Sequence, residues 1–280
     1  MKKVLTIILM ALAITALFVS CDEATNEHSI DDGKKGPHEL GNDHKCATCG
    51  KYVSSNLTEL SDILNTIKAE TIVNPTVLLT GEYEITTAIT VEKNGLTIEG
   101  DGSAKFVVPS TSSVDTVLKV TGEGVSVKDL SFELASKMTI GIITGSGKNL
   151  KVENNTFTGK YENNDDQVSR GICLNAGTQG YEITDNTFKN LRQPAYLEGI
   201  GKVTGNTIEN TRGWVVCQNY AIEFEDNEFV GWNAEDIAII KNNVEDAGNY
   251  SQEKCQEISS ANNNCRIHQQ SLDFRIPSGT

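Results

Sequence analysis

The sequence predicts an all-β protein that folds as a right-handed parallel β-helix, a β-solenoid of stacked coils, with an N-terminal amphipathic capping helix. Three observations predict this fold: a repeated strand–turn phrase, short apolar runs punctuated by Gly, Asn and Pro, and a helical pattern confined to the start of the folded region. A strand–turn repeat buries its apolar side only against neighbouring repeats, so the pattern requires stacked coils.

The repeated phrase is an apolar residue, two more residues, an Asn, one residue and a second apolar residue. Spacings of about 20 residues between successive Asn positions match one coil of two or three short strands. Stacking places equivalent side chains about 4.8 Å apart, where an amide can donate to one neighbour and accept from the other. We therefore expect a structural ladder rather than ligands from the Asn residues of the phrase: Asn155, Asn186, Asn206, Asn227 and Asn242.

A capping pattern and helical spacing predict one helix ahead of the strands. Asn56-Leu-Thr-Glu59 has the form of a capping box, and apolar residues recur on one face up to a helix end near Glu70. Short strands follow without another helical stretch, which excludes alternating strand–helix units. The first expected strands are 77–79, 82–85, 89–91, 96–98, 106–108 and 117–120, and later repeats pair two strands, such as 171–174 with 181–183 and 194–197 with 202–203.

The start of the chain predicts export and lipid anchoring. Lys2 and Lys3 precede an apolar run over 4–19, which is typical of a secretory signal and too short for a membrane-spanning helix. Leu17-Phe-Val-Ser-Cys21 resembles a bacterial lipobox, in which the Cys becomes the lipidated first residue of the mature protein. Cys21 therefore predicts lipid attachment in the bacterial cell envelope, to the outer membrane on its periplasmic face or at the cell surface. The alternative is an ordinary signal peptide cut elsewhere.

Composition divides the chain into four expected regions. These are a signal peptide over 1–21, a polar flexible tether over 22–55, the β-helix domain over 56–250, and a C-terminal cap or tail over 251–280. Removal of the signal leaves 22 basic against 38 acidic residues, a net charge of −16. This balance argues against nucleic acid as a partner.

The expected tether holds a group of potential metal ligands. His38, His44, Cys46 and Cys49 have the ligand types of a zinc site. Their spacing matches no zinc motif, however, and a local disulfide or free thiols are the alternatives. The Cys-Ala-Thr-Cys segment also lacks the preceding strand and following helix of a redox motif.

The remaining cysteines fall into two pairs. Cys173 and Cys217 are expected in matching columns two coils apart, too distant for a disulfide, and so as buried thiols. Cys255 and Cys265 bracket a polar segment and could close a small loop in an exported protein.

The N-terminal part of the predicted coils is similar to a known superfamily. The expected helix is followed in order by Thr71-Ile-Val73, Val77-Leu-Leu-Thr-Gly81-Glu-Tyr83, Ile89-Thr-Val91 and Lys93-Asn-Gly-Leu-Thr-Ile-Glu-Gly100-Asp-Gly102. This order resembles the opening of pectin-lyase-like right-handed parallel β-helices, and the Asn-Thr-Phe repeats are similar to the same superfamily. The resemblance implies the fold. It implies no single function, because the superfamily includes polysaccharide lyases, glycoside hydrolases, copper-delivery proteins, adhesins and spacers.

A set of arginines marks the candidate binding surface. Arg170, Arg192 and Arg212 each lie two or three residues before the first strand of three consecutive coils. Stacking would bring these like charges within about 5–10 Å, which is unfavourable unless anions lie among them. Nearby residues add candidate metal ligands, Asp165, Asp166 and Glu198, and aromatic faces, Tyr196 and Trp214. Such a groove suits an acidic sugar polymer, with Ca²⁺ as the candidate cofactor. The alternative is a set of surface ion pairs with the Asp-rich insert.

These features together predict a lipid-anchored, exported β-helix that binds a polysaccharide or a surface partner along one coil face. A Ca²⁺-dependent pectate-lyase-like enzyme and a structural or adhesin-type protein without a small ligand are the alternatives, and no catalytic residue is assigned. A polygalacturonase-like hydrolase would need a Gly-His-Gly segment, and the sequence from residue 56 onward holds one His, His268.

Overall fold

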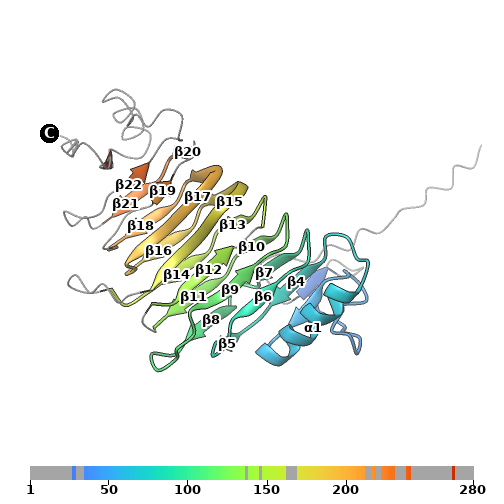
Figure 1. The fold of residues 1–280 in the computed structure, drawn as a ribbon. Helices are drawn as coiled ribbons and strands as arrows, with labels where there is room; N and C mark the ends of the chain where they lie inside the picture. The colour runs from blue at the N-terminus through green and yellow to red at the C-terminus, as the bar shows by residue number, and fades with distance from the viewer. Residues whose placement is uncertain are drawn as a thin grey trace, which may run out of the picture.

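The structure is a computed structural model, and it describes residues 27–29, 35–135, 138–144, 147–161, 169–211, 216–218, 222–230, 238–240 and 267–268. Their strands wind into successive coils that follow one another from the N-terminal helix towards β22, as the colour gradient of Figure 1 shows. Every strand pair of the coils is parallel. The predicted all-β parallel β-helix is confirmed.

Each coil contributes strands to three faces. The first face consists of β3 (Tyr52–Ser54), β4 (Thr76–Leu79), β7 (Thr97–Gly100), β10 (Ser126–Lys128), β13 (Lys151–Glu153), the C-terminal parts of β15 (Arg170–Thr184) and β17 (Gln193–Thr204), and β20 (Ile222–Glu225). The second face consists of β5 (Glu82–Glu84), β8 (Lys105–Val108), β11 (Ser131–Leu134), β14 (Thr156–Thr158), β16 (Thr187–Lys189), β18 (Thr207–Glu209) and β21 (Glu228–Val230). The third face consists of β6 (Ile89–Val91), β9 (Thr116–Val120), β12 (Ile140–Thr144), the N-terminal parts of β15 and β17, β19 (Val216–Gln218), β22 (Ala238–Ile240) and β23 (Ile267–His268).

Two strands are longer than the sequence pattern predicts. The runs expected as separate strands in two repeats are joined, so β15 and β17 each continue from the third face into the first. Residues in the bends also pair, with Thr178 opposite Gly199. Gly180 and Gly199, with φ values of 69° and 151°, supply backbone conformations that residues with a Cβ rarely adopt. The local sequence shows a turn, whereas pairing between adjacent coils makes it part of the sheet.

A column of aromatic rings fills the core behind the second face. Tyr83, Phe106, Phe132, Phe157 and Phe188 occupy the same register on successive strands and are all buried. Successive ring centroids lie 5.5, 5.3, 4.5 and 5.1 Å apart. These separations fall within the range in which aromatic pairs add to the burial energy.

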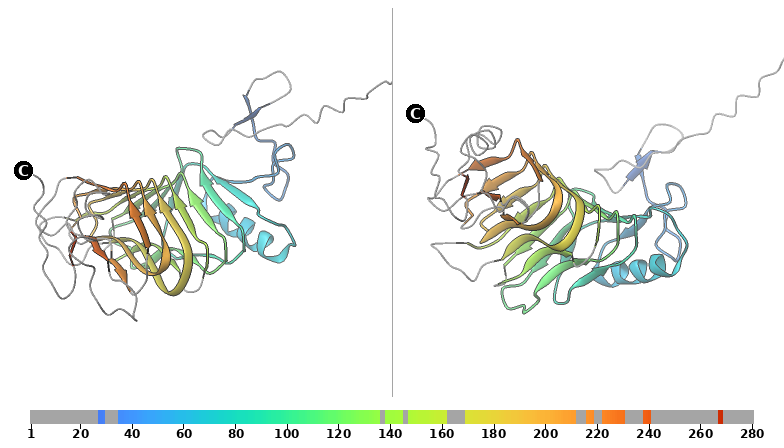
Figure 2. Two further views of the ribbon diagram at one scale, coloured as in Figure 1. Left: turned by 90° about the horizontal axis from the view of Figure 1, so that it is seen from above. Right: turned by 45° about the horizontal axis from the view of Figure 1, so that its top comes forward.

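The predicted capping helix closes the N-terminal end of this core. The helix α1 spans Leu57–Ala69, and the Oδ1 atom of its N-cap residue Asn56 accepts a hydrogen bond from the backbone N–H of Glu59 (3.0 Å). Its buried face, made of Leu60, Ile63 and Ile67, joins the same hydrophobic cluster as the first coils. Figure 2 shows α1 lying at the end of the coil stack.

The packed structure begins earlier than the expected domain start at residue 56. Strand β3 lies within the stretch expected as a tether and pairs in parallel with β4. Its carbonyl at Ser54 accepts hydrogen bonds from the Tyr83 hydroxyl (2.5 Å) and the Thr80 N–H (2.9 Å). The sequence gives little sign of this strand because only Tyr52 and Val53 are apolar in it, and their burial depends on the neighbouring coil.

The remaining described strands, β1 (Glu27–Ser29) and β2 (Lys35–Pro37), form a separate antiparallel pair. Within the residues that the structure describes, no helix has the length and apolar content needed to cross a membrane. The predicted signal peptide, Cys21 and the Cys255–Cys265 pair lie outside the described residues.

Candidate functional site

The asparagines of the repeat form a continuous hydrogen-bonded column inside the coil. Asn155, Asn186, Asn206 and Asn227 are each at most 1% exposed. The Oδ1 atom of Asn186 accepts from the backbone N–H (2.9 Å) and the Nδ2 (3.0 Å) of Asn155, and Asn206 receives the same two bonds from Asn186. Asn242 lies outside the described residues.

The donors of this column are used within the fold as well. The Nδ2 group of Asn186 also donates to the carbonyls of Val152 (2.8 Å) and Thr184 (2.9 Å). Each such amide therefore satisfies backbone groups at a turn where the strand ladder is interrupted. This leaves no hydrogen-bonding capacity for a ligand, so the Asn column is structural.

The outward surface of the third face carries the candidate binding residues. On β15, Ile172 and Leu174 are buried, and a Cβ at Gly171 would meet the Phe188 ring in the core, whereas Arg170 and Cys173 are partly exposed. The register pairs Arg170 with Gln193 and Cys173 with Tyr196 of β17. A guanidinium, an amide and a phenol therefore lie on one surface of two adjacent coils.

Arg170 is held in place and partly desolvated. Its Nε donates a hydrogen bond to Oε1 of Gln193 (3.1 Å). Burial and the nearby positive charge of Arg192 lower the pKa of Arg170, and Cys173 has a smaller opposing effect. Among the described residues, no carboxylate forms an ion pair with Arg170. The side chain is thus a positioned cation close to a second cation.

The structure corrects the expected alignment of the arginines. Arg170 lies opposite Gln193, so Arg192 is one position out of register, and its backbone N–H donates to the Ser169 carbonyl (3.0 Å). A one-residue offset changes the side to which a strand residue points. The sequence could not show the offset, because the distance from Arg to the following apolar run differs between the two repeats.

Other predicted site residues are only partly placed. Glu198 lies on β17 in register with Gln218, and its side chain is not among those described. Four further candidates lie outside the described residues: Asp165, Asp166, Arg212 and Trp214.

The two core cysteines do not share a column. Cys173 is in register with Tyr196 and Val216 on the outward side. Cys217 is instead in register with Leu197 and, one coil further, with Leu174. Cys173 is a partly exposed free thiol, not the fully buried one expected. Burial nevertheless raises its pKa to about 11, against a smaller lowering effect of Arg170. It is a weak nucleophile at neutral pH for that reason.

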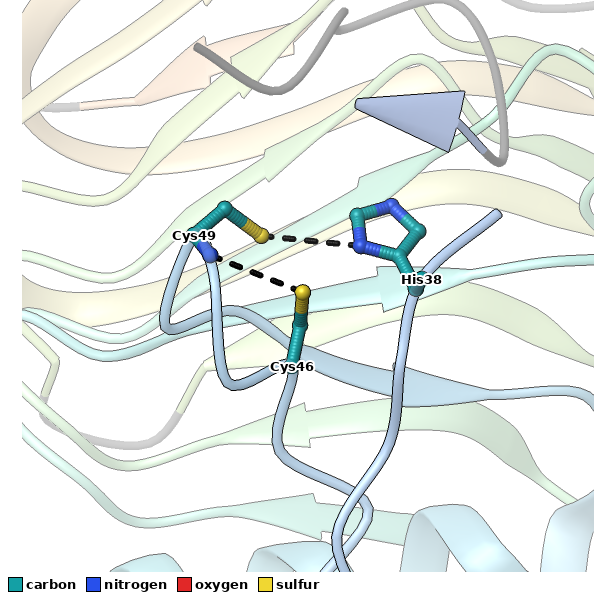
Figure 3. A group of neighbouring side chains, drawn as sticks. All are labelled: His38, Cys46 and Cys49. Atoms are coloured by element: carbon teal, nitrogen blue, oxygen red, sulfur yellow. Dashed lines mark hydrogen bonds between the residues drawn. The ribbon is translucent and has the colours of Figure 1, made fainter. Parts of the chain in front are cut away.

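A second cluster lies in the segment before β3. Its residues have the ligand types of a zinc site, but their spacing in the sequence matches no zinc motif. Potential ligand atoms of His38, Cys46 and Cys49 lie within 4.8 Å of one another. Figure 3 shows both sulfur atoms and the imidazole directed towards a common point. His44, the fourth expected ligand, is not part of the group.

Comparison of the chain with protein-family models, with curated proteins and with solved structures found no match. The fold therefore rests on the strand order and register described above. The superfamily resemblance remains a similarity of sequence pattern.

Proposed function

We propose that this protein is a lipid-anchored β-helix of the cell envelope that binds an acidic polysaccharide along the outward surface of β15 and β17. The observation that carries the proposal is Arg170, which is partly desolvated, donates to Gln193 and forms no ion pair with a carboxylate among the described residues. A positioned guanidinium of this kind suits the carboxylate of a uronic acid, to which Arg can donate two parallel hydrogen bonds.

The neighbouring side chains support a sugar ligand over a simple anion. Gln193 supplies an amide beside Arg170, and Tyr196 supplies an aromatic ring with a hydroxyl on the same outward surface. Sites for organic ligands commonly combine apolar or aromatic surface with a few positioned polar groups.

Because the chain is negatively charged overall, binding of an acidic polymer must depend on contacts at the Arg170 surface. The whole chain carries a formal net charge of −14, which opposes approach of an acidic polymer by long-range attraction. Binding would depend on the Arg170 surface and would be lost when that surface is changed.

The proposal is limited to binding. A lyase would need a base and a Ca²⁺ site made of carboxylates. The candidate carboxylates Asp165 and Asp166 lie outside the described residues, and no acidic cluster suited to a metal occurs among the described ones. A structural surface protein would not bind polygalacturonate.

The test compares polygalacturonate binding by wild type, Arg170→Gln and Lys189→Gln in affinity electrophoresis. Lys189 lies on β16 of the second face and is ion-paired with Glu209, so both variants lose one positive charge. Loss of a charge-assisted hydrogen bond, worth about 1.5–3 kcal/mol, should weaken binding about tenfold or more in Arg170→Gln alone. Equal binding of polygalacturonate by the two variants, or no binding of polygalacturonate by the wild type, would overturn the proposal.

Anchoring is tested separately in cells. The wild type should incorporate a labelled fatty acid and sediment with membranes, whereas Cys21→Ser should do neither. Membrane association that persists in Cys21→Ser would rule out the proposed anchor.

A further inference from the structure

The His38, Cys46 and Cys49 cluster has the dimensions of a zinc site. With Zn–S bonds of about 2.3 Å and Zn–N bonds of about 2.0–2.1 Å, tetrahedral ligands lie roughly 3.6–3.8 Å apart. The Nδ1 of His38 and the Sγ of Cys49 are 3.5 Å apart, and all the ligand atoms lie within 4.8 Å. Small side-chain movements would bring the three atoms onto one ion.

The backbone around the two cysteines is arranged as a closed turn. The N–H of Gly50 donates to the Cys46 carbonyl (2.9 Å), and Gly50 has a φ of 76°, which favours glycine. The N–H of Cys49 points at the Cys46 sulfur, 3.5 Å away. A hydrogen bond of this kind orients the sulfur as a ligand.

Strand β3 and the preceding segment hold the cluster in the fold. The N–H of Cys46 donates to the Lys51 carbonyl (2.8 Å), and Cys46 forms an antiparallel bridge with Leu40, two residues after His38. The Cys46 side chain is 1% exposed. The backbone that carries His38 and Cys46 is therefore held by the fold, which reduces the ordering cost of binding.

The two cysteines differ in redox state. Cys46 is a free thiol, whereas Cys49 is disulfide-bonded. A thiolate, not a disulfide sulfur, is the metal ligand, so reduction of Cys49 must precede metal binding.

We propose that the reduced form of this cluster binds one Zn²⁺ through His38, Cys46 and Cys49. A dithiol reductant supplies the two electrons and two protons that convert the disulfide of Cys49 into two thiols, and is itself oxidised to a disulfide. Zinc then displaces the protons of the Cys46 and Cys49 thiols, which are released to solvent, and takes the neutral imidazole of His38. Two thiolates and one imidazole favour zinc over Ca²⁺ or Mg²⁺. The fourth coordination position is left for water or another donor.

The test uses the full chain after treatment with a dithiol, removal of the reductant under argon, and titration with Co²⁺ as a spectroscopic substitute for zinc. The wild type should show thiolate-to-cobalt charge-transfer absorption that saturates at one equivalent and disappears on addition of Zn²⁺. The unreduced protein should bind at least tenfold more weakly.

Matched variants assign the signal, since the chain contains seven cysteines. His38→Asn and Cys46→Ser should weaken binding at least tenfold, whereas His44→Asn and Cys173→Ser should bind as the wild type does. Asn suits the control because His44 has a φ of 60°, which Asn tolerates. Circular dichroism checks folding, and His38→Asn decides the matter if Cys46→Ser does not fold. Wild-type cobalt affinity in both His38→Asn and Cys46→Ser, or no charge-transfer band in the reduced wild type, would overturn the proposal.

Discussion

The asparagine column and the outward surface around Arg170 are built by the same stacking of coils, yet they follow opposite rules. In the column, Asn155, Asn186 and Asn206 occupy one register and bond directly to one another. On the outward surface, Gln193 instead of a second arginine lies opposite Arg170. The repeat therefore places identical residues in contact in the Asn column, whereas on the outward surface it does not bring two arginines into contact.

The difference shows which side chains can occupy the same position in successive coils. An amide is both donor and acceptor, so the Oδ1 of each Asn accepts a hydrogen bond from the Nδ2 of the Asn on the preceding coil. A guanidinium is donor-only and always charged, and burial together with the neighbouring Arg192 lowers the pKa of Arg170. Inward columns of identical amides can thus be stabilising, whereas identical guanidinium groups in contact repel one another.

The largest expected effect comes from breaking the Asn column with Asn186→Asp. The introduced carboxylate would face the oxygen atoms of Val152, Thr184 and Asn206, all of which now accept from the Asn186 amide. Burying an unpaired charge or an unmet acceptor costs about 3 kcal/mol or more. Urea unfolding followed by circular dichroism should show this loss at neutral pH.

The matched control is Asn190→Asp, four residues later. Asn190 is only partly buried, has a φ of 51° that Asp also tolerates, and accepts a hydrogen bond that a carboxylate can accept. Its stability should change by less than about 1 kcal/mol. Equal effects of the two substitutions would show that the column contributes no more than a surface turn does.

An intermediate effect is expected at the start of the aromatic column, where Tyr83 is 1% exposed. Burial raises the pKa of Tyr83 from 10.0 to about 12, against a smaller lowering by its hydrogen bond to Ser54. Since the folded-state pKa is the higher one, the native state holds the proton more tightly. The associated stability, about 2–3 kcal/mol, is present below pH 10 and is lost as the pH rises through 12.

Comparison with Tyr83→Phe isolates this group from other residues that titrate at high pH. At pH 8 the variant should be less stable by about 0.5–1.5 kcal/mol, because the hydrogen bond to Ser54 is lost. The difference in free energy of unfolding between wild type and Tyr83→Phe should vanish or change sign between pH 10 and 12 in chemical unfolding experiments. A gap that stays constant with pH would contradict the assignment.

The smallest effect is expected on the outward side of the first face. Lys151 forms an ion pair with Glu182 on the next coil (3.1 Å), and both side chains are more than two-fifths exposed. Solvent screens such a pair, so Lys151→Gln should change the free energy of unfolding by less than about 0.5 kcal/mol. A loss as large as that in Asn186→Asp would show that outward columns stabilise the coil as much as inward ones.

The candidate sites were less predictable than the fold. The repeat indicated the coil period and the columns, but a one-residue difference in where Arg170 and Arg192 precede their strands could not be resolved without the register. The cluster of His38, Cys46 and Cys49 was visible only as residue types, because its spacing matches no zinc motif. The residues 38–50 come together through bonds to β3 and through the Leu40–Cys46 bridge, which no local pattern encodes.

The sequence by itself determined the parallel β-helix, the capping helix and the positions of the Asn column. Each of these follows from a repeating pattern of apolar, turn and capping residues, whose physical cause is local or acts between successive repeats. Only the tertiary structure decided that β3 belongs to the coil, that Gln193 lies opposite Arg170, and that Cys46 and Cys49 meet His38. These depend on register and on contacts between non-repeating segments, and a shift of one residue in either would change which side chains meet.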